Sequence, residues 1–268
     1  MQNNTLSRPG FSLSGTALKR IACLSMLLDH IGASLLENGL FKQGSFWPGN
    51  VQLDGVLRLV GRLAFPIYCF LLVEGFLHTH DFKKYALRML VFAVLSEIPF
   101  DLMYGGTWFY PVHQNVIWTL LLGLLGIRLT ETVRRKGKRW AFLLVFVLVA
   151  LAGMVLGTLG MVDYYGAGVL TVLIFYIFRG RKWWCLLGQL LALYWVNVEL
   201  LGGLMYPVRL LGMEFELCQQ GLALLALIPI WLYRGRQGHH SKPFQYACYA
   251  FYPVHMLVLA VVLRCVNR

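Results

Sequence analysis

The sequence predicts an all-α polytopic membrane protein, a single bundle of about nine transmembrane helices (eight to ten) that occupies residues 1–268 as one domain. Hydrophobic residues make up 58% of the 268 positions and charged residues only 13%, with a mean hydropathy of +0.63. Soluble domains have about 25% charged and about 45–50% apolar residues. Apolar runs close to the roughly 20 residues that cross a bilayer core recur along the chain. The composition therefore excludes an ordinary soluble domain, a disordered chain and a small disulfide-stapled module.

Nine apolar runs, each bounded by polar or charged loops, are the predicted spans. In chain order they are residues 17–36, 56–77, 84–104, 115–133, 139–158, 165–178, 183–201, 216–233 and 245–264. The sixth is short and glycine-rich at its start, which keeps counts of eight and ten open. The first, second and last runs carry ionisable residues at depth, and a polar connection joins the third to the fourth.

The cations predict that the N-terminus is cytoplasmic and the C-terminus outside, because cytoplasmic loops of membrane proteins are enriched in Lys and Arg. The loops and helix ends assigned to the cytoplasm hold Arg8, Lys19, Arg20, Lys83, Lys84, Arg88, Arg128, Arg134, Arg135, Lys136, Lys138, Arg139, Arg179, Arg181, Lys182, Arg234, Arg236 and Lys242. The outer side keeps Lys42, Arg58, Arg62, Arg209, Arg264 and Arg268. This bias also accounts for the net charge of +12, so we expect a lipid partner and no nucleic acid.

The first span carries Asp29 and His30 deep in an apolar run, where ionisable groups are costly and usually functional. Lys19 lies eleven residues before His30. Eleven residues return to within about 20° of the same helix face and rise about 16 Å, so Lys19 is expected at the cytoplasmic edge below His30. A cation at one end of this helix face, Lys19, and an imidazole at the other, His30, suit an elongated anionic ligand. The alternative is a snorkelling lysine and a histidine that serves packing.

The second span supplies partners for the first. Arg62 lies in its outer half, at the depth expected for Asp29, and an Asp29–Arg62 ion pair is the leading prediction; a pair that only fixes helix packing is the alternative. Pro66 cannot donate to the carbonyl of Arg62, so a kink is expected there. Glu74 falls near the cytoplasmic edge, about 18 Å from Arg62 along the axis.

The last span repeats the pattern of the first. His255 lies eleven residues past Phe244, so it is expected at the depth of His30, with Tyr252 beside it. Two histidines lack the further ligands that zinc takes, and the six cysteines have no metal-type spacing, so no metal is expected. General acid–base chemistry is the more economical interpretation of the two histidines.

The connection between the third and fourth spans predicts an external vestibule. Its polar residues, with those of a later outer loop, are Glu97, Asp101, His113, Gln114, Asn115, Thr119, Asp163 and Tyr164. Loop turns and helix caps are the alternative explanation for each.

Four segments carry a resemblance to a known family: SGTALKRIACLSMLLDHIGA, GRLAFPIYCFLLVEGFLHTHDFKKYALRMLVFAVLSEIPFD, QNVIWTLLLGLL and YAFYPVH. The chain resembles the TraX family, whose name-giving member is the F-pilin acetylation protein of conjugation systems. The resemblance implies an acetyl-CoA-dependent acetyltransferase of the bacterial cytoplasmic (inner) membrane. Related transmembrane acyltransferases share a basic residue, ten intervening residues and a histidine, which here fall on Lys19 and His30. They also have an arginine motif on the next span, where Arg58 and Arg62 stand without a strict match.

The resemblance turns these residues into a mechanistic hypothesis. His30 is the expected general base, with Asp29 and Arg62 as its polar support and His255 positioning a substrate. The residues expected to bind the donor acetyl-CoA from the cytoplasm are Lys19, Arg20, Glu74, Lys83, Lys84 and Arg88. An unknown acceptor, the amine or hydroxyl of a peptide or protein N-terminus, a glycan or a lipid, would arrive through the outer vestibule at His113, Gln114, Asn115, Thr119 and Asp163.

Two other classes of function stay open. Buried His, Asp and Arg are also typical of a proton-coupled transporter of a small metabolite. A non-catalytic scaffold for envelope assembly is the third interpretation. Acetyl-CoA dependence separates the acetyltransferase from the transporter.

Overall fold

The computed structural model describes residues 12–40, 53–210, 212–238 and 241–267. Arg8, Lys42 and Arg268 of the charge argument lie outside the described residues. The elements in chain order are α1 (Gly15–His30), its π-helical continuation η1 (Ile31–Leu40), α2 (Leu53–Gly61), α3 (Ala64–His78), α4 (Phe82–Tyr104), α5 (Val116–Arg134), α6 (Arg139–Leu159), α7 (Tyr165–Ile177), α8 (Trp183–Tyr194), the π-helical η2 (Trp195–Leu200), β1 (Met205–Leu210), β2 (Met213–Cys218), the 3₁₀-helical η3 (Gln220–Ala226), α9 (Leu227–Leu232) and α10 (Lys242–Val266).

Within the described part of the chain, four helices are long and apolar enough to cross a bilayer. They are Leu53–His78, Val116–Arg134, Arg139–Leu159 and Pro243–Val266. Four such helices indicate a multi-pass membrane protein. The predicted sixth and eighth spans are represented by shorter apolar helices, Tyr165–Ile177 and Gln220–Leu232. The count of nine spans and the orientation therefore stay predictions.

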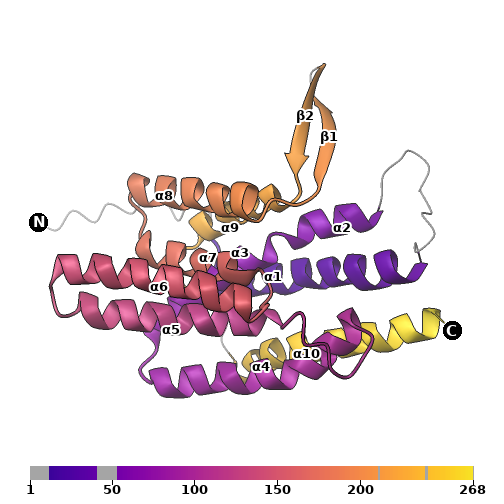
Figure 1. The fold of residues 1–268 in the computed structure, drawn as a ribbon, viewed down its shortest axis with the longest axis horizontal. Coiled ribbons are helices and arrows are strands. Elements are labelled where there is room, and N and C mark those ends of the chain that lie inside the picture. The colour runs from indigo at the N-terminus through magenta and orange to yellow at the C-terminus, as the bar shows by residue number, and fades with distance from the viewer. Residues whose placement is uncertain (1–11, 41–52, 211, 239–240, 268) are drawn as a thin grey trace, which may run out of the picture.

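The fold is all-α as predicted, with one two-stranded β-hairpin added to the helices. β1 pairs antiparallel with β2, Met205 opposite Cys218 and Leu210 opposite Met213. The hairpin stands away from the helices (Figure 1). Glu216–Cys218, predicted as the start of the eighth span, belongs to β2 instead. Gly202 and Gly203 precede the hairpin at φ +61° and +121°, where a side chain would strain the backbone, so the helix ends there.

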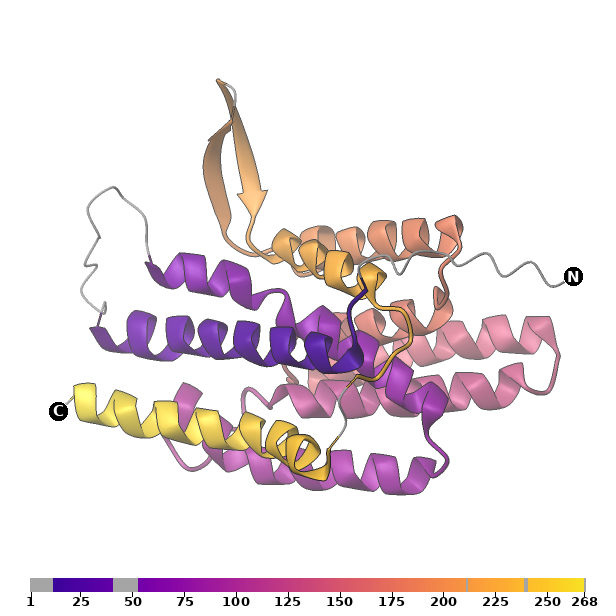
Figure 2. The same cartoon turned by 180° about the vertical axis from the view of Figure 1, so that it is seen from behind.

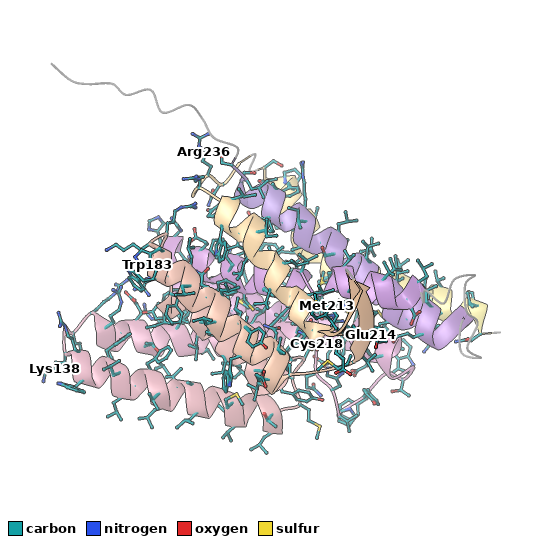
Figure 3. The ribbon with its side chains drawn as sticks, turned by 90° about the horizontal axis from the view of Figure 1, so that it is seen from above. Lys138, Trp183, Met213, Glu214, Cys218 and Arg236 are labelled. Atoms are coloured by element: carbon teal, nitrogen blue, oxygen red, sulfur yellow. The ribbon has the colours of Figure 1, made fainter. Side chains whose placement is uncertain are left out.

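The helices form one bundle in which α1 holds a central place. Figure 2 shows α1 lying between α2 and α10, and α4 packs along α10. α5, α6 and α7 pack on one another through glycines: a Cβ on Gly157 would come within 2.8 Å of the Gly166 backbone. Figure 3 shows Lys138 and Arg236, both assigned to the cytoplasmic side, toward the same end of the bundle as Trp183.

The second predicted span is broken beside Arg62. α2 ends at Gly61 and α3 begins at Ala64, and the amide of Arg62 bonds back to the carbonyl of Leu59 at 3.3 Å. Pro66 lies in the first turn of α3, where its missing N–H leaves no helical bond unmade. The expected departure from regular helix is confirmed. It falls just before the proline, at the arginine that the site uses.

Candidate active site

A cavity of about 160 Å³ brings together residues predicted from four separate stretches of sequence. Asp29 and His30 reach it from the end of α1, Arg62 from the break between α2 and α3, and His113 and Asp163 from two loops. Asp29 and His30 are each less than a tenth exposed. The cavity is thus lined by several ionisable groups, of which Asp29 and His30 are buried.

His30 and His255 form a direct pair inside the bundle. Nδ1 of His30 lies 2.7 Å from Nε2 of His255, and Nδ1 of His255 lies 2.6 Å from the carbonyl oxygen of Phe251. The rings of Phe251, His255 and His30 stack in series, with centroids 4.6 and 4.9 Å apart. The expectation that the two histidines reach the same depth is therefore confirmed.

The contacts of the pair assign its tautomers when both rings are neutral. A carbonyl oxygen only accepts, so Nδ1 of His255 carries the proton and donates to Phe251. Nε2 of His255 is then the acceptor, and Nδ1 of His30 donates to it. Nε2 of His30 then keeps its lone pair, which no described residue uses in a hydrogen bond, on a ring that lines the cavity. The arrangement can therefore accept a proton from a group in the cavity.

Asp29 is held by two arginines. Nη2 of Arg62 lies 2.6 Å from Oδ1, which is the predicted pair, and Nη1 of Arg58 lies 3.1 Å from Oδ2. Nε of Arg58 also lies 3.4 Å from a carboxylate oxygen of Glu37. One turn apart on the second span, the two arginines give the carboxylate a partner on each oxygen, which fixes it in the low-dielectric interior.

The polar network continues into residues that the sequence did not single out. Nη1 of Arg62 donates to Oε1 of Gln220 at 3.1 Å, and Nε2 of Gln220 donates to Oδ1 of Asn197 at 3.1 Å. Asn197 in turn donates to the carbonyl of Leu193. Arg62 is therefore anchored to η2 and η3 as well as to α1.

Gly61 is a point of close contact between the second predicted span and Asp29. A Cβ at this position would overlap the side chain of Asp29. The missing side chain lets the broken helix approach α1 closely enough for both ion pairs.

Three of the predicted vestibule residues, His113, Asp163 and Tyr164, line the cavity. Nε2 of His113 lies 3.5 Å from Oδ1 of Asp163. The hydroxyl of Thr119 donates to the backbone carbonyl of Asp163, and the amide of Asp163 donates to the carbonyl of Gln114. Thr119 and the Gln114 backbone therefore hold the loop that carries Asp163.

Gln114, Asn115 and Thr119 do not line this cavity. The Asn115 side chain caps α5 by accepting from the amide of Ile117, and its Nδ2 donates to Glu97. The Gln114 side chain donates to the carbonyl of Pro111. For Gln114 and Asn115 the turn-and-cap explanation describes the contacts.

Tyr104 and Tyr164 also line the cavity; Tyr164 is among the predicted vestibule residues, whereas no role was predicted for Tyr104. Tyr104 stands edge-on to His30, with ring centroids 6.4 Å apart. Tyr164 stacks on Phe65 at 3.9 Å and has φ +62°. Tyr104 lies at the end of α4, away from any periodic signal, which is why a sequence pattern did not reveal it.

The predicted donor residues occupy separate surfaces. Lys19 is half-buried on α1, with His30 at the far end of the same helix, and between them Sγ of Cys23 lies 3.1 Å from the Tyr68 hydroxyl. Arg20 is exposed over the ring of Phe244 at 5.7 Å.

The other donor residues lie at the start of α4 or in another cavity. Lys83, Lys84 and Arg88 are exposed, and Nζ of Lys84 pairs with Asp81 at 3.3 Å. The Lys84 amide donates to the Asp81 carboxylate and lowers its pKa. Glu74, predicted to belong with these cations, instead lines a second cavity among other residues.

Comparison with known proteins gives a match along nearly the whole chain. The family model described as "TraX protein" matches residues 14–263. A protein of Dichelobacter nodosus named "Probable fimbrial assembly protein FimC, serogroup H1" is 28% identical over 258 residues, which cover 92% of this chain and 94% of the relative. No solved structure matches.

Proposed function

The chain belongs to the TraX family, and on this premise we propose that it is an integral membrane acetyltransferase that moves an acetyl group from acetyl-CoA to an amine or hydroxyl of an acceptor. The observation that carries the proposal is the His30–His255 pair at the cavity that also holds Asp29 and Arg62. A histidine with a fixed tautomer and a free ring nitrogen is what general-base catalysis requires.

In the proposed reaction, Nε2 of His30 takes a proton from the acceptor as its nitrogen or oxygen attacks the thioester carbonyl carbon. The carbon–sulfur bond then breaks, and the proton passes from His30 to the leaving thiolate. His255 keeps Nδ1 of His30 protonated throughout and so keeps Nε2 basic. Asp29 holds the Arg58 and Arg62 guanidiniums at the cavity, where positive charge stabilises a developing oxyanion.

The donor route follows one face of α1. Lys19, Cys23, Met26 and His30 recur at three- and four-residue spacing, and Met26 lines the cavity. The thioester would reach His30 along this stripe, with the donor phosphates near Lys19 and Arg20 and the cations at the start of α4.

The acceptor would enter on the side of His113 and Asp163. The name of the Dichelobacter nodosus relative concerns fimbrial assembly, so a protein subunit with a free N-terminal amine is the first acceptor class to test. Glycan and lipid hydroxyls are the next.

A proton-coupled transporter is the competing function, and the same histidine pair favours it. Buried histidines and carboxylates that contact one another also relay protons in carriers. A transporter would show no acetyl-CoA dependence, which separates the two.

The test measures acetyl transfer by the purified protein in nanodiscs. Acetyl-CoA labelled in the acetyl group is supplied with a synthetic peptide that has a free N-terminal amine, and with an amino sugar and a lipid amine in parallel. CoA thiol release and acceptor mass are followed for the wild type, for His30→Ala, and for the matched control His80→Ala at an exposed position. We expect transfer to be abolished only in His30→Ala. Folded wild-type protein that neither binds nor consumes acetyl-CoA would refute the proposal and favour the transporter.

A further inference from the structure

A second cavity, larger than the first at about 270 Å³, lies between α3, α7, α8 and α9. Among the described residues, none lines both this cavity and the His30 cavity. Phe65 and Tyr68 line the first cavity, whereas Phe70 and Glu74 line the second. At about 100° per residue these two pairs lie on different faces of α3. The second cavity is therefore a distinct space, close to the size at which small-molecule sites begin, about 300 Å³.

Three guanidiniums surround the second cavity: Arg179, Arg181 and Arg234. Arg181 donates to the backbone carbonyls of Trp231 and Tyr233, which holds the end of α9 in place. Among the described residues, neither Arg181 nor Arg234 forms an ion pair with a carboxylate. Burial and the neighbouring Arg234 lower the pKa of Arg181.

Arg179 is only weakly neutralised. It donates to the carbonyl of Tyr176 at 2.7 Å and lies 3.9 Å from Glu131. Arg134 already occupies both oxygens of that carboxylate at 2.7 Å. The second cavity thus has an excess of positive charge.

Hydrogen bonds also join other residues around the cavity, some of which are aromatic. The indole N–H of Trp231 donates to Oε1 of Gln189 at 2.9 Å, and Nε2 of Gln189 donates to the carbonyl of Phe178 at 3.0 Å. Glu74 is the one carboxylate among the lining residues, and it shares a hydrogen bond with the Tyr233 hydroxyl. A ligand would meet positions that are already fixed by protein contacts.

The geometry points to a binding site for a phosphate group in this cavity, with Arg234 and Arg179 as its principal ligands. Guanidiniums bind phosphate oxygens in a bidentate manner, and a cluster of arginines without matching carboxylates is the arrangement such a ligand neutralises. Two sources carry this chemistry: the phosphates of the proposed acyl donor and the phosphate of a lipid headgroup. The site does not depend on the role of His30.

The test compares charge changes of opposite sign at the same cavity. Arg234 is exposed, and its side chain forms no hydrogen bond or ion pair with the described residues, so Arg234→Gln removes a ligand and leaves the Arg181 hydrogen bonds in place. Glu74→Gln removes the opposing charge. Arg236→Gln is the matched control, since Arg236 is exposed two residues along the chain and does not line the cavity. Thermal melting in detergent checks that each variant is folded.

Two phosphate sources are titrated separately. Calorimetry in neutral detergent measures the binding of CoA. Native mass spectrometry measures how much phosphatidylglycerol stays bound to protein released from nanodiscs. We expect about tenfold weaker binding of one source in Arg234→Gln, a severalfold gain in Glu74→Gln and no change in Arg236→Gln. A change confined to CoA assigns the site to the donor, and one confined to the lipid assigns it to the headgroup. Folded Arg234→Gln that binds both sources as well as the wild type would overturn the inference. The predicted affinity changes in a wild-type protein that shows no acetyl transfer would count against the acetyltransferase proposal alone.

Discussion

Replacing His255 tests whether it sets the protonation of His30. The phenyl ring of His255→Phe matches the stack, in which the ring at this position lies between Phe251 and His30 at near-parallel angles of 15° and 10°. Phenylalanine fills the space of the imidazole but has no acceptor for the proton on Nδ1 of His30. His255→Gln keeps an oxygen that can accept this proton. The two variants therefore separate packing from hydrogen bonding.

The magnitude follows from the 2.7 Å bond between the two rings. Leaving one buried donor without its partner costs about 1–3 kcal/mol, which corresponds to about 5- to 150-fold in rate. In the variant, His30 can avoid an unpaired N–H by changing tautomer, so that the proton lies on Nε2 instead of Nδ1. Nε2 is the nitrogen that must be unprotonated to act as the base, so this tautomer is inactive. We therefore expect kcat of His255→Phe to fall by about 10- to 100-fold, with the KM for acetyl-CoA unchanged. His255→Gln should stay within about tenfold of the wild type.

The assay is acetyl transfer under saturating donor, combined with ¹⁵N shifts of a histidine-labelled sample in micelles. The shifts report which nitrogen of His30 carries the proton, independently of any acceptor. His255→Phe with wild-type kcat, or a wild-type His30 protonated on Nε2, would refute the relay. Equal losses in His255→Phe and His255→Gln would assign His255 a role other than accepting this hydrogen bond.

Three further predictions concern the ion pairs, the helix contact and the donor route. Asp29→Asn leaves two mostly buried guanidiniums without their shared carboxylate and should destabilise the protein by about 3–5 kcal/mol. The measurement is the melting temperature in detergent, which should fall. An unchanged melting temperature would show that the two ion pairs contribute no stability. Gly61→Ala should lower the stability by about 1–3 kcal/mol because its Cβ overlaps Asp29. Gly221→Ala is the control: the nearest atom to its Cβ is 3.3 Å away, so it should lower the melting temperature less. Equal losses of stability would contradict the close approach at Gly61. Lys19→Ala should raise the KM for acetyl-CoA about three- to tenfold with kcat unchanged, measured by initial rates; a fall in kcat alone would place Lys19 in the chemistry.

The sequence predicted the parts of the site that depend on depth within a helix. Lys19 and Phe244 each lie eleven residues before a histidine, so rise per residue alone placed His30 and His255 at one level. The same reasoning matched Asp29 with Arg62. These predictions needed only that each segment be helical, which its composition fixed.

Contacts that depend on rotation of one element against another could not be predicted. Arg62 meets Gln220 across 158 residues, through a 3₁₀ turn that has no periodic signature. Glu74 shows the limit within one helix. It lies twelve residues from Arg62, which turns about 120° on a regular helix, so the two face different directions. The depth of Glu74 in the second span suggested that it lies beside Lys19, but the direction in which its helix face points was not taken into account.

The site residues gather where the backbone departs from regular α-helix, and this explains how a membrane bundle supplies a polar cavity. α1 changes to π-helix directly after His30, and the Ser34 hydroxyl donates to the His30 carbonyl at 2.6 Å, where the wider turn needs a partner. Arg62 lies in the break between α2 and α3, and its Nε donates to the carbonyl of Arg58.

Tyr164 opens α7 in the left-handed region, next to Asp163. At each of these places a side chain forms hydrogen bonds with backbone groups that lipid could not bind. The same irregularity directs a charged residue into the bundle instead of toward its surface. A regular helix would point these groups at faces set by the 3.6-residue period. The breaks free three segments to meet at one cavity, and backbone strain at functional sites is expected for this reason.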